Sequence, residues 1–115
     1  MIFLTLPYPP SVNTYWGFKG SHRYLTKKAI TFKSEVHYQF INSKQKSFGG
    51  EIIKIKIRLH PPDKRIRDID NCIKSLLDAL CQAGVFVDDS QIHKLEIEKS
   101  TIVKNGACTV IIEKY

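Results

Sequence analysis

The sequence is poor in the residues that mark disulfide-rich, zinc-binding or membrane-spanning proteins. It has only three cysteines, Cys72, Cys81 and Cys108, and no C-x-x-C pair. This odd, scattered set excludes a disulfide framework, argues against a zinc site and is typical of reduced thiols in the cytosol. No apolar run approaches the roughly 20 residues that cross a bilayer, and the N-terminus lacks the features of a leader peptide. We therefore expect a cytoplasmic protein that does not enter a membrane.

Acidic residues are also scarce. The chain has 11 Asp and Glu against 18 Lys and Arg, which gives a formal net charge of +7 and a pI near 9.4. This balance favours nucleic acid as a partner over acidic proteins or a membrane surface. The 115 residues contain no repeat, no low-complexity segment and no linker. The length predicts a single domain over residues 1–115.

Hydrophobic periodicity predicts the first half of the fold. A short apolar strand, Ile2 to Leu6, runs into Pro7, Pro9 and Pro10. Residues 11–21 contain Gly17 and Gly20 and are interpreted as a loop. Thr26 is expected to cap a helix that ends in the segment 44–50. Apolar residues recur along that helix at helical spacing: Ala29, Phe32, Val36 and Phe40.

The second half continues with a strand over residues 53–60, in which isoleucine and leucine alternate with Lys54, Lys56, Arg58 and His60. A helix with an apolar stripe from Ile69 to Leu80 follows, and Gly84 is expected just past its end. Leu95 and Ile97 indicate a third strand, and Asn105-Gly106 a hairpin turn into a final strand. The expected fold is therefore α+β, in the order β-α-β-α-β-β, with a mixed four-stranded sheet packed against two helices.

Two acidic pairs flank the second expected helix. Asp68 and Asp70 lie at its start, and Asp88 and Asp89 lie beyond its end. Residues two apart in a helix point about 200° from each other. Asp68 is therefore expected at or before the N-cap, with Asp70 and Lys74 on one helical face.

These carboxylates have a functional and a purely structural interpretation. Mg²⁺ prefers carboxylate oxygens, and two such ions can activate water and stabilise the leaving oxygen of a phosphodiester. The structural interpretation makes Asp68 a helix cap and Asp70-Lys74-Asp78 a solvated charge ladder. Asp89 joins a metal site only if its loop returns along the sheet to the helix start.

Several blocks resemble the RusA family of Holliday junction resolvases over essentially the whole chain. They are Pro9-Pro10-Ser11-Val12-Asn13-Thr14-Tyr15-Trp16, Arg67-Asp68-Ile69-Asp70-Asn71 with Lys74, and Ala83-Gly84-Val85-Phe86-Val87-Asp88-Asp89-Ser90-Gln91-Ile92. The acidic blocks D-x-D-N-x-x-K and A-G-V-x-x-D-D-x-Q-I are specific in combination, whereas either alone is only suggestive.

The resemblance implies roles for individual residues. Asp68, Asp70 and Asp89 match the metal-binding catalytic aspartates, Lys74 matches the catalytic lysine, and Asp88 matches a supporting acid. It also implies Mg²⁺ or Mn²⁺ as cofactor, and a homodimer that makes paired symmetrical nicks in four-way junction DNA. A two-fold junction suits two active sites related by the same axis.

Candidate DNA contacts come from two regions. Lys64, Arg65 and Arg67 neighbour the carboxylates. Asn13, Tyr15 and Trp16 lie near Lys19, His22 and Arg23, where aromatic rings could stack on bases or instead anchor the loop to the core.

The sequence thus predicts a metal-dependent endodeoxyribonuclease of DNA recombination and repair, encoded by a bacterium or phage and acting on nucleoid DNA. Two alternatives remain open. One is a nuclease that prefers flaps or forks, and the other is a non-catalytic basic DNA-binding module.

Overall fold

A four-stranded mixed sheet forms the centre of the computed structural model, which describes all residues from 1 to 115. The strands are β1 (Ile2–Leu6), β4 (Ile53–His60), β5 (Ile92–Lys99) and β6 (Ala107–Lys114), in the order β1-β6-β4-β5. β4 and β5 run parallel, whereas β6 is antiparallel to both β1 and β4. The expected α+β class and mixed four-stranded sheet are confirmed.

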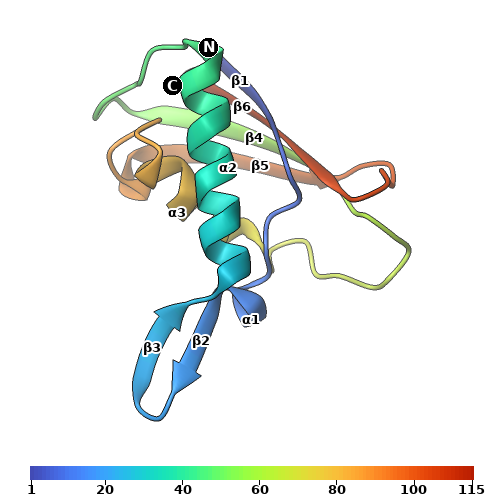
Figure 1. The fold of residues 1–115 in the computed structure, drawn as a ribbon. Coiled ribbons are helices and arrows are strands. Elements are labelled where there is room, and N and C mark those ends of the chain that lie inside the picture. Colours follow the sequence, from blue (N-terminus) through green and yellow to red (C-terminus); the bar gives the residue numbers. More distant parts are fainter.

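Two helices, α2 (Lys27–Ser43) and α3 (Ile73–Gln82), cover one face of this sheet (Figure 1). Alternation places every second strand residue against them, and this packing supplies the main hydrophobic driving force for the fold. Buried residues of β4 are Ile53, Ile55, Ile57 and Leu59, and those of α2 are Ala29, Phe32, Val36 and Phe40. The apolar pattern of the sequence therefore identified the core on both elements.

The ends of both helices follow from local chemistry. Thr26 caps α2 by accepting a hydrogen bond from the Ala29 N–H at 3.3 Å, as expected. α2 ends where Lys44 adopts a left-handed conformation with φ 56°. Gly84, with φ 86°, follows the end of α3, where glycine avoids the steric cost that other residues would meet.

The start of α3 differs from the expectation. The helix begins at Ile73 with Cys72 as its N-cap, so Asp70 precedes it and shares no helical face with Lys74. Residues 69–72 form turns instead, in which the Asn71 N–H donates to the Asp68 carbonyl at 3.3 Å. A helix would direct the Asn71 carbonyl to the Ser75 N–H, but it accepts the Val12 N–H at 2.9 Å. A contact from a distant part of the chain therefore shortens the helix.

Residues 11–21 are not a loop. They form α1 (Val12–Tyr15), β2 (Trp16–Lys19) and a turn into β3 (His22–Leu25). β2 and β3 pair as an antiparallel hairpin that projects from the foot of α2 (Figure 1). Gly20, with φ 64°, lies in the turn. Gly17 leaves room for the Tyr24 ring, because a Cβ at Gly17 would lie 2.5 Å from that ring.

Asn105 and Gly106 do form a turn, with φ values of 71° and 76°. The expected hairpin is nevertheless wrong, because β5 and β6 are not neighbours and β4 lies between them. The turn belongs to a longer connection from one edge of the sheet to its interior. A left-handed turn signal thus located the reversal but not the strand partner.

The second face of the sheet carries charges of both signs. Lys54 pairs with Glu113 at 3.4 Å, and Arg58 pairs with Glu98 at 2.5 Å. This pairing favours a solvated face over a surface that tracks phosphates. No helix combines the length and the apolar character needed to cross a bilayer.

Candidate active site

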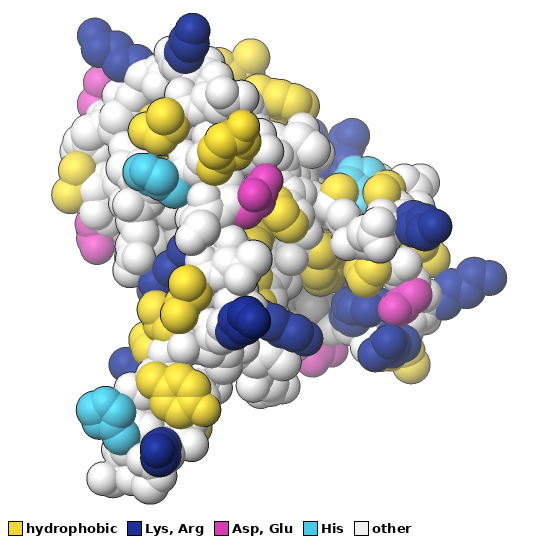
Figure 2. All heavy atoms as spheres, viewed as in Figure 1, with side chains coloured by type: hydrophobic (Ala, Val, Ile, Leu, Met, Phe, Trp, Pro, Cys, Tyr) yellow, Lys and Arg dark blue, Asp and Glu magenta, His cyan; other side chains and the backbone are white.

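A cleft of about 930 Å³ opens between the foot of α2 and the loop that follows β4 (Figure 2). The Pro-rich segment after β1 forms one wall of it. The lining of the cleft combines apolar surface with polar and charged side chains, which include Lys27, Lys28, Glu35, Arg65, Arg67, Asp68 and Asn71. Basic side chains outnumber acidic ones among these residues, so the cleft suits an anionic ligand.

The Pro-rich segment is fastened directly to the start of α3. The Val12 N–H donates to the Asn71 carbonyl at 2.9 Å. The buried Ser75 hydroxyl lies 2.6 Å from the Pro10 carbonyl and 2.9 Å from the Cys72 carbonyl. These contacts bring two sequence blocks about 60 residues apart into one wall of the cleft, and they fix the segment that carries Asp68 and Asp70.

Asp68 and Asp70 are exposed, and their carboxylates have no partner in the chain. Neither accepts a side-chain hydrogen bond or forms an ion pair, whereas each of the other nine acidic residues does at least one of these. Unpaired carboxylates are unexpected in a protein with a net charge of +7. The two side chains are therefore available for an external cation.

Lys74 connects the other two acids near the start of α3. Its Nζ lies 2.8 Å from Asp89 Oδ2 and 3.3 Å from Asp78 Oδ1. The hydrogen bond that Lys74 donates to Asp89, followed by that to Asp78, raises the pKa of Lys74 above its ordinary value. Lys74 therefore stays protonated at neutral pH. The loop after α3 does fold back, and it brings Asp89 to the lysine.

Gln91 holds that loop in place. Asp89 opens a short 3-10 helix, η1 (Asp89–Gln91), which Asp88 caps by accepting the Ser90 N–H at 3.0 Å. Hydrogen bonding by Ser90, first through its side chain and then through its N–H, holds the pKa of Asp88 below its usual range. The buried Gln91 amide accepts the N–H groups of residues 87 and 88 and donates to the carbonyls of residues 49 and 51, at 2.6 to 2.9 Å.

Sequence reasoning assigned Gln91 no role beyond its place in the motif. A buried amide can satisfy two donors and two acceptors, but nothing in the sequence showed that Gly49 and Glu51 would lie beside it. The geometry makes Gln91 the residue that positions Asp89. Asp88 acts on the same turn through the backbone, which agrees with a supporting role.

The donor types fit a divalent magnesium or manganese ion, because all three aspartates offer hard carboxylate oxygens. Within one chain, however, the three aspartates are not gathered into one metal-binding group. Nowhere in the chain do three or more His, Cys, Asp or Glu side chains form a group that could hold a metal ion. Asp89 is engaged with Lys74, whereas Asp68 and Asp70 are free.

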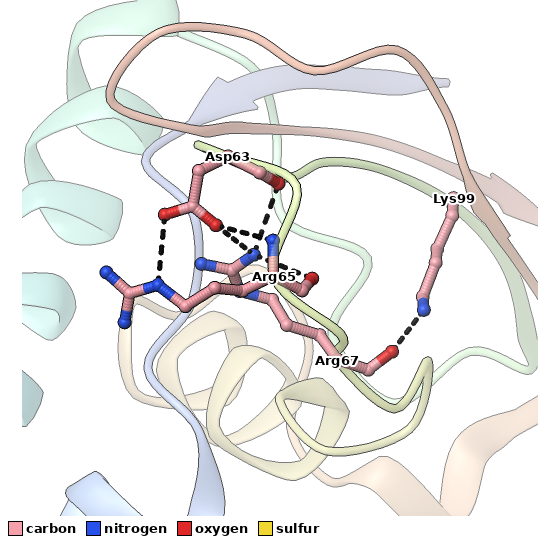
Figure 3. A network of polar contacts seen from close by, with 4 residues as sticks. All are labelled: Asp63, Arg65, Arg67 and Lys99. Atoms are coloured by element: carbon pink, nitrogen blue, oxygen red, sulfur yellow. Dashed lines mark hydrogen bonds and ion pairs between the residues drawn. The ribbon is translucent and has the colours of Figure 1, made fainter.

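The loop between β4 and Asp68 is organised around Asp63 (Figure 3). Its Oδ1 accepts the Arg67 Nη1–H at 2.8 Å and the Arg65 N–H at 2.9 Å. Lys99 donates to the Arg67 carbonyl. The hydrogen bonds from Arg67 and then from the Arg65 backbone lower the pKa of Asp63 to about 2. Of the predicted DNA contacts here, Lys64 and Arg65 are exposed, whereas Arg67 is mostly covered.

The structure separates the three candidates of the N-terminal region. Asn13 is exposed on α1, and Trp16 is half-buried with the Arg23 guanidinium 3.9 Å from its ring centroid. Tyr15 is only 2% exposed and its hydroxyl has no partner. It packs edge-on against Trp16 and anchors the hairpin, so it is not accessible to bases.

Sequence reasoning missed an aromatic ring and two cations. Phe18 is 69% exposed on the hairpin, where Figure 2 shows hydrophobic, basic and histidine side chains side by side. Lys27 and Lys28 open α2, whose first turn holds no acidic residue. Lysines at a helix N-terminus oppose the macrodipole. That mismatch was readable in the sequence.

Comparison with known proteins places the chain among nucleases. Residues 7–113 match the family model described as Endodeoxyribonuclease RusA. The crossover junction endodeoxyribonuclease rusA of Enterobacteria phage HK97 is 38% identical over 101 residues, which is 88% of this chain and 84% of the relative. The proteins named Crossover junction endodeoxyribonuclease RusA of Shigella sonnei and Escherichia coli strain K12 are each 32% identical over 110 residues. In both cases the match covers 95% of this chain and 91% of the relative.

Proposed function

The chain belongs to the RusA family of endodeoxyribonucleases, and on that premise we propose that it cleaves four-way DNA junctions in recombination and repair. One observation carries the proposal beyond the family: Asp68 and Asp70 are the only two acidic side chains without a partner, and Asp68 lines a basic cleft. A protein that needed these acids only for folding would pair them with some of its 18 basic residues.

The proposed site consists of Asp68, Asp70 and Asp89 as ligands for Mg²⁺ or Mn²⁺, with Lys74 beside them. A bound divalent ion would activate water and stabilise the leaving oxygen of the phosphodiester. Lys74, kept protonated by its two carboxylate partners, would hold a non-bridging phosphate oxygen and offset developing negative charge. Its 63% exposed side chain is accessible to a phosphate.

The proposed binding surface runs from the cleft to the projecting hairpin. Lys27, Lys28, Lys64 and Arg65 supply positive charge for phosphates, and Phe18 offers an exposed ring for an unstacked base. Trp16 and Arg23 form one stacked unit beside it. We further propose that two copies act together, because symmetrical nicks on a two-fold junction need two sites. The protein would then work on nucleoid DNA in the cytoplasm.

The decisive experiment compares cleavage of a synthetic four-way junction with linear duplex, fork and flap of the same sequence, with and without Mg²⁺. We expect paired nicks in the junction only with metal. Asp70→Asn should keep junction affinity and lower the cleavage rate by at least about a hundredfold, or roughly 2.7 kcal/mol of transition-state stabilisation. Glu96→Gln is the matched control, since it removes the same charge from the opposite face of the sheet.

One observation favours a second candidate, the non-catalytic DNA-binding module. The three aspartates do not form a metal-binding group within one chain. A module would bind junctions with equal affinity in the Asp70→Asn variant and cleave none of the four substrates under any metal. Preferential cleavage of the fork or flap would instead identify the nuclease with the other substrate preference.

A further inference from the structure

Ile66 is the most exposed apolar residue of the chain, with 99% of its surface accessible. It lies between two arginines and two positions before Asp68. Single exposed apolar side chains are common and by themselves need no explanation. The distinguishing feature of Ile66 is the rigidity and chemistry of its surroundings.

The backbone on both sides of Ile66 is fixed (Figure 3). On one side, the Arg65 N–H donates to Asp63 Oδ1 at 2.9 Å. On the other, Arg67 Nη1 donates to the same carboxylate, and the Arg67 carbonyl accepts from Lys99. The five residues from 63 to 67 therefore form a closed turn. Its tip presents a β-branched side chain that has few rotamers to lose on binding.

Ile66 also borders the proposed active cleft. It lines the same cavity as Asp68 and Lys28 while remaining open to solvent. An apolar side chain between cations matches one mode of DNA recognition. In that mode the cations hold phosphates on either side, while the apolar group enters a base step, partly unstacks it and kinks the duplex.

We propose that Ile66 is a wedge that enters a base step of the DNA bound in the cleft beside Asp68. This inference rests on the proposed function, since it assigns a DNA contact to the same site. Unstacking one step costs more in continuous duplex than where bases are already unpaired. A wedge beside the acids therefore favours branched DNA over linear duplex at the position where the strand would be cut.

The wedge is tested by the fluorescence of 2-aminopurine placed in successive steps around the branch point of a synthetic junction. Protein is added at saturation in EDTA, so that no cleavage occurs. We expect the 2-aminopurine fluorescence to rise at one base step when the unaltered protein binds. Ile66→Ala should at least halve that rise while changing the junction affinity by less than about threefold, and Ile66→Leu should restore it. Ile52→Ala, at another exposed isoleucine, is the matched control and should leave the rise unchanged.

An undiminished rise with Ile66→Ala overturns the inference, as does the absence of any rise with the unaltered protein. Sedimentation of each variant tests the competing role, a contact with a second copy of the chain. Loss of the dimer in Ile66→Ala, with fluorescence unchanged in the species that binds, would assign Ile66 to the subunit interface. The fluorescence test in EDTA does not depend on cleavage. A protein that unstacks the junction in EDTA but never nicks it in the assay with Mg²⁺ would therefore keep the wedge and refute the proposed nuclease.

Discussion

Lys74 and Asp89, fifteen positions apart in the chain, meet at 2.8 Å between Nζ and Oδ2. The contact joins the first turn of α3 to η1. It brings an acid from beyond the helix back to the helix start, where the other two predicted ligands lie nearby in sequence.

Replacing Lys74 with methionine should separate stability from catalysis. The ion pair is well exposed, so the free energy of unfolding should fall by less than about 1 kcal/mol. Cleavage of the junction should fall by about a hundredfold or more, because the charge on the phosphate is no longer offset. Urea denaturation and single-turnover cleavage check the two values. If the variant cleaves the junction as fast as the unaltered protein, Lys74 has no role in catalysis.

Gln91→Leu should destabilise the protein and its site together. The change leaves two N–H groups and two carbonyls without their partner, at a cost of about 2–4 kcal/mol. Gln91→Glu keeps an acceptor for the two N–H groups but sets a buried carboxylate oxygen against the two carbonyls, so it should also destabilise the protein. Urea denaturation of both variants tests this, and a Gln91→Leu protein as stable as the original would contradict it.

Asp63→Asn should weaken junction binding even though it removes a negative charge from a DNA-facing surface. Simple electrostatics predicts tighter binding, whereas loss of the carboxylate that orders Arg65 and Arg67 predicts the reverse. Fluorescence anisotropy at two salt concentrations shows whether the affinity for the junction rises or falls. Lys64→Gln is the comparison, because it removes a charge from the same loop without touching the Asp63 network.

The Asp63 turn should also be insensitive to pH over the working range. Its pKa is lowered from 3.8 to about 2 in the folded chain. A depressed carboxyl pKa stabilises the folded state above the unfolded pKa, and this contribution is lost as the pH falls from about 4 to about 2. An NMR titration of the Asp63 carboxyl carbon should show a midpoint near 2. A midpoint near 4 would show that the arginine contacts do not persist in solution.

Gly106→Ala should cost about 2 kcal/mol of stability and disturb the cleft. The position has φ 76°, and an added Cβ would lie 2.7 Å from the Tyr8 Cβ, which lines the cleft wall. Gly49→Ala is the control for backbone strain alone, since Gly49 has φ 58° and open space around it. Equal losses in the two variants would mean that contact with Tyr8 contributes nothing.

Local signals in the sequence were sufficient for the core, for the N-cap of α2 and for the glycine that follows α3. Thr26, Gly84 and the alternating residues of β4 act through neighbours a few positions away, so their roles are readable without a structure. The hairpin of β2 and β3 was missed because its strands have four residues each and contain Gly17, which local rules assign to a loop.

The remaining errors at the site arose from contacts between distant segments. The hydrogen bond from Val12 to Asn71 shortened α3 and removed Asp70 from the helical face that it was predicted to share with Lys74. Burial of Tyr15 depended on packing that periodicity does not encode. The predicted roles of the aspartates as metal ligands stay predictions, because they depend on a bound ion.

The pairing of β1 with β6 has a consequence for synthesis of the protein. Ile2 lies opposite Ile112, so β1 finds its partner strand only after β4, β5 and β6 have been made. The Pro-rich wall of the cleft follows β1 directly and depends on that pairing for its place. A nascent chain whose β6 is still inside the ribosome would therefore lack a formed cleft, and DNA could be bound there only after β6 has emerged.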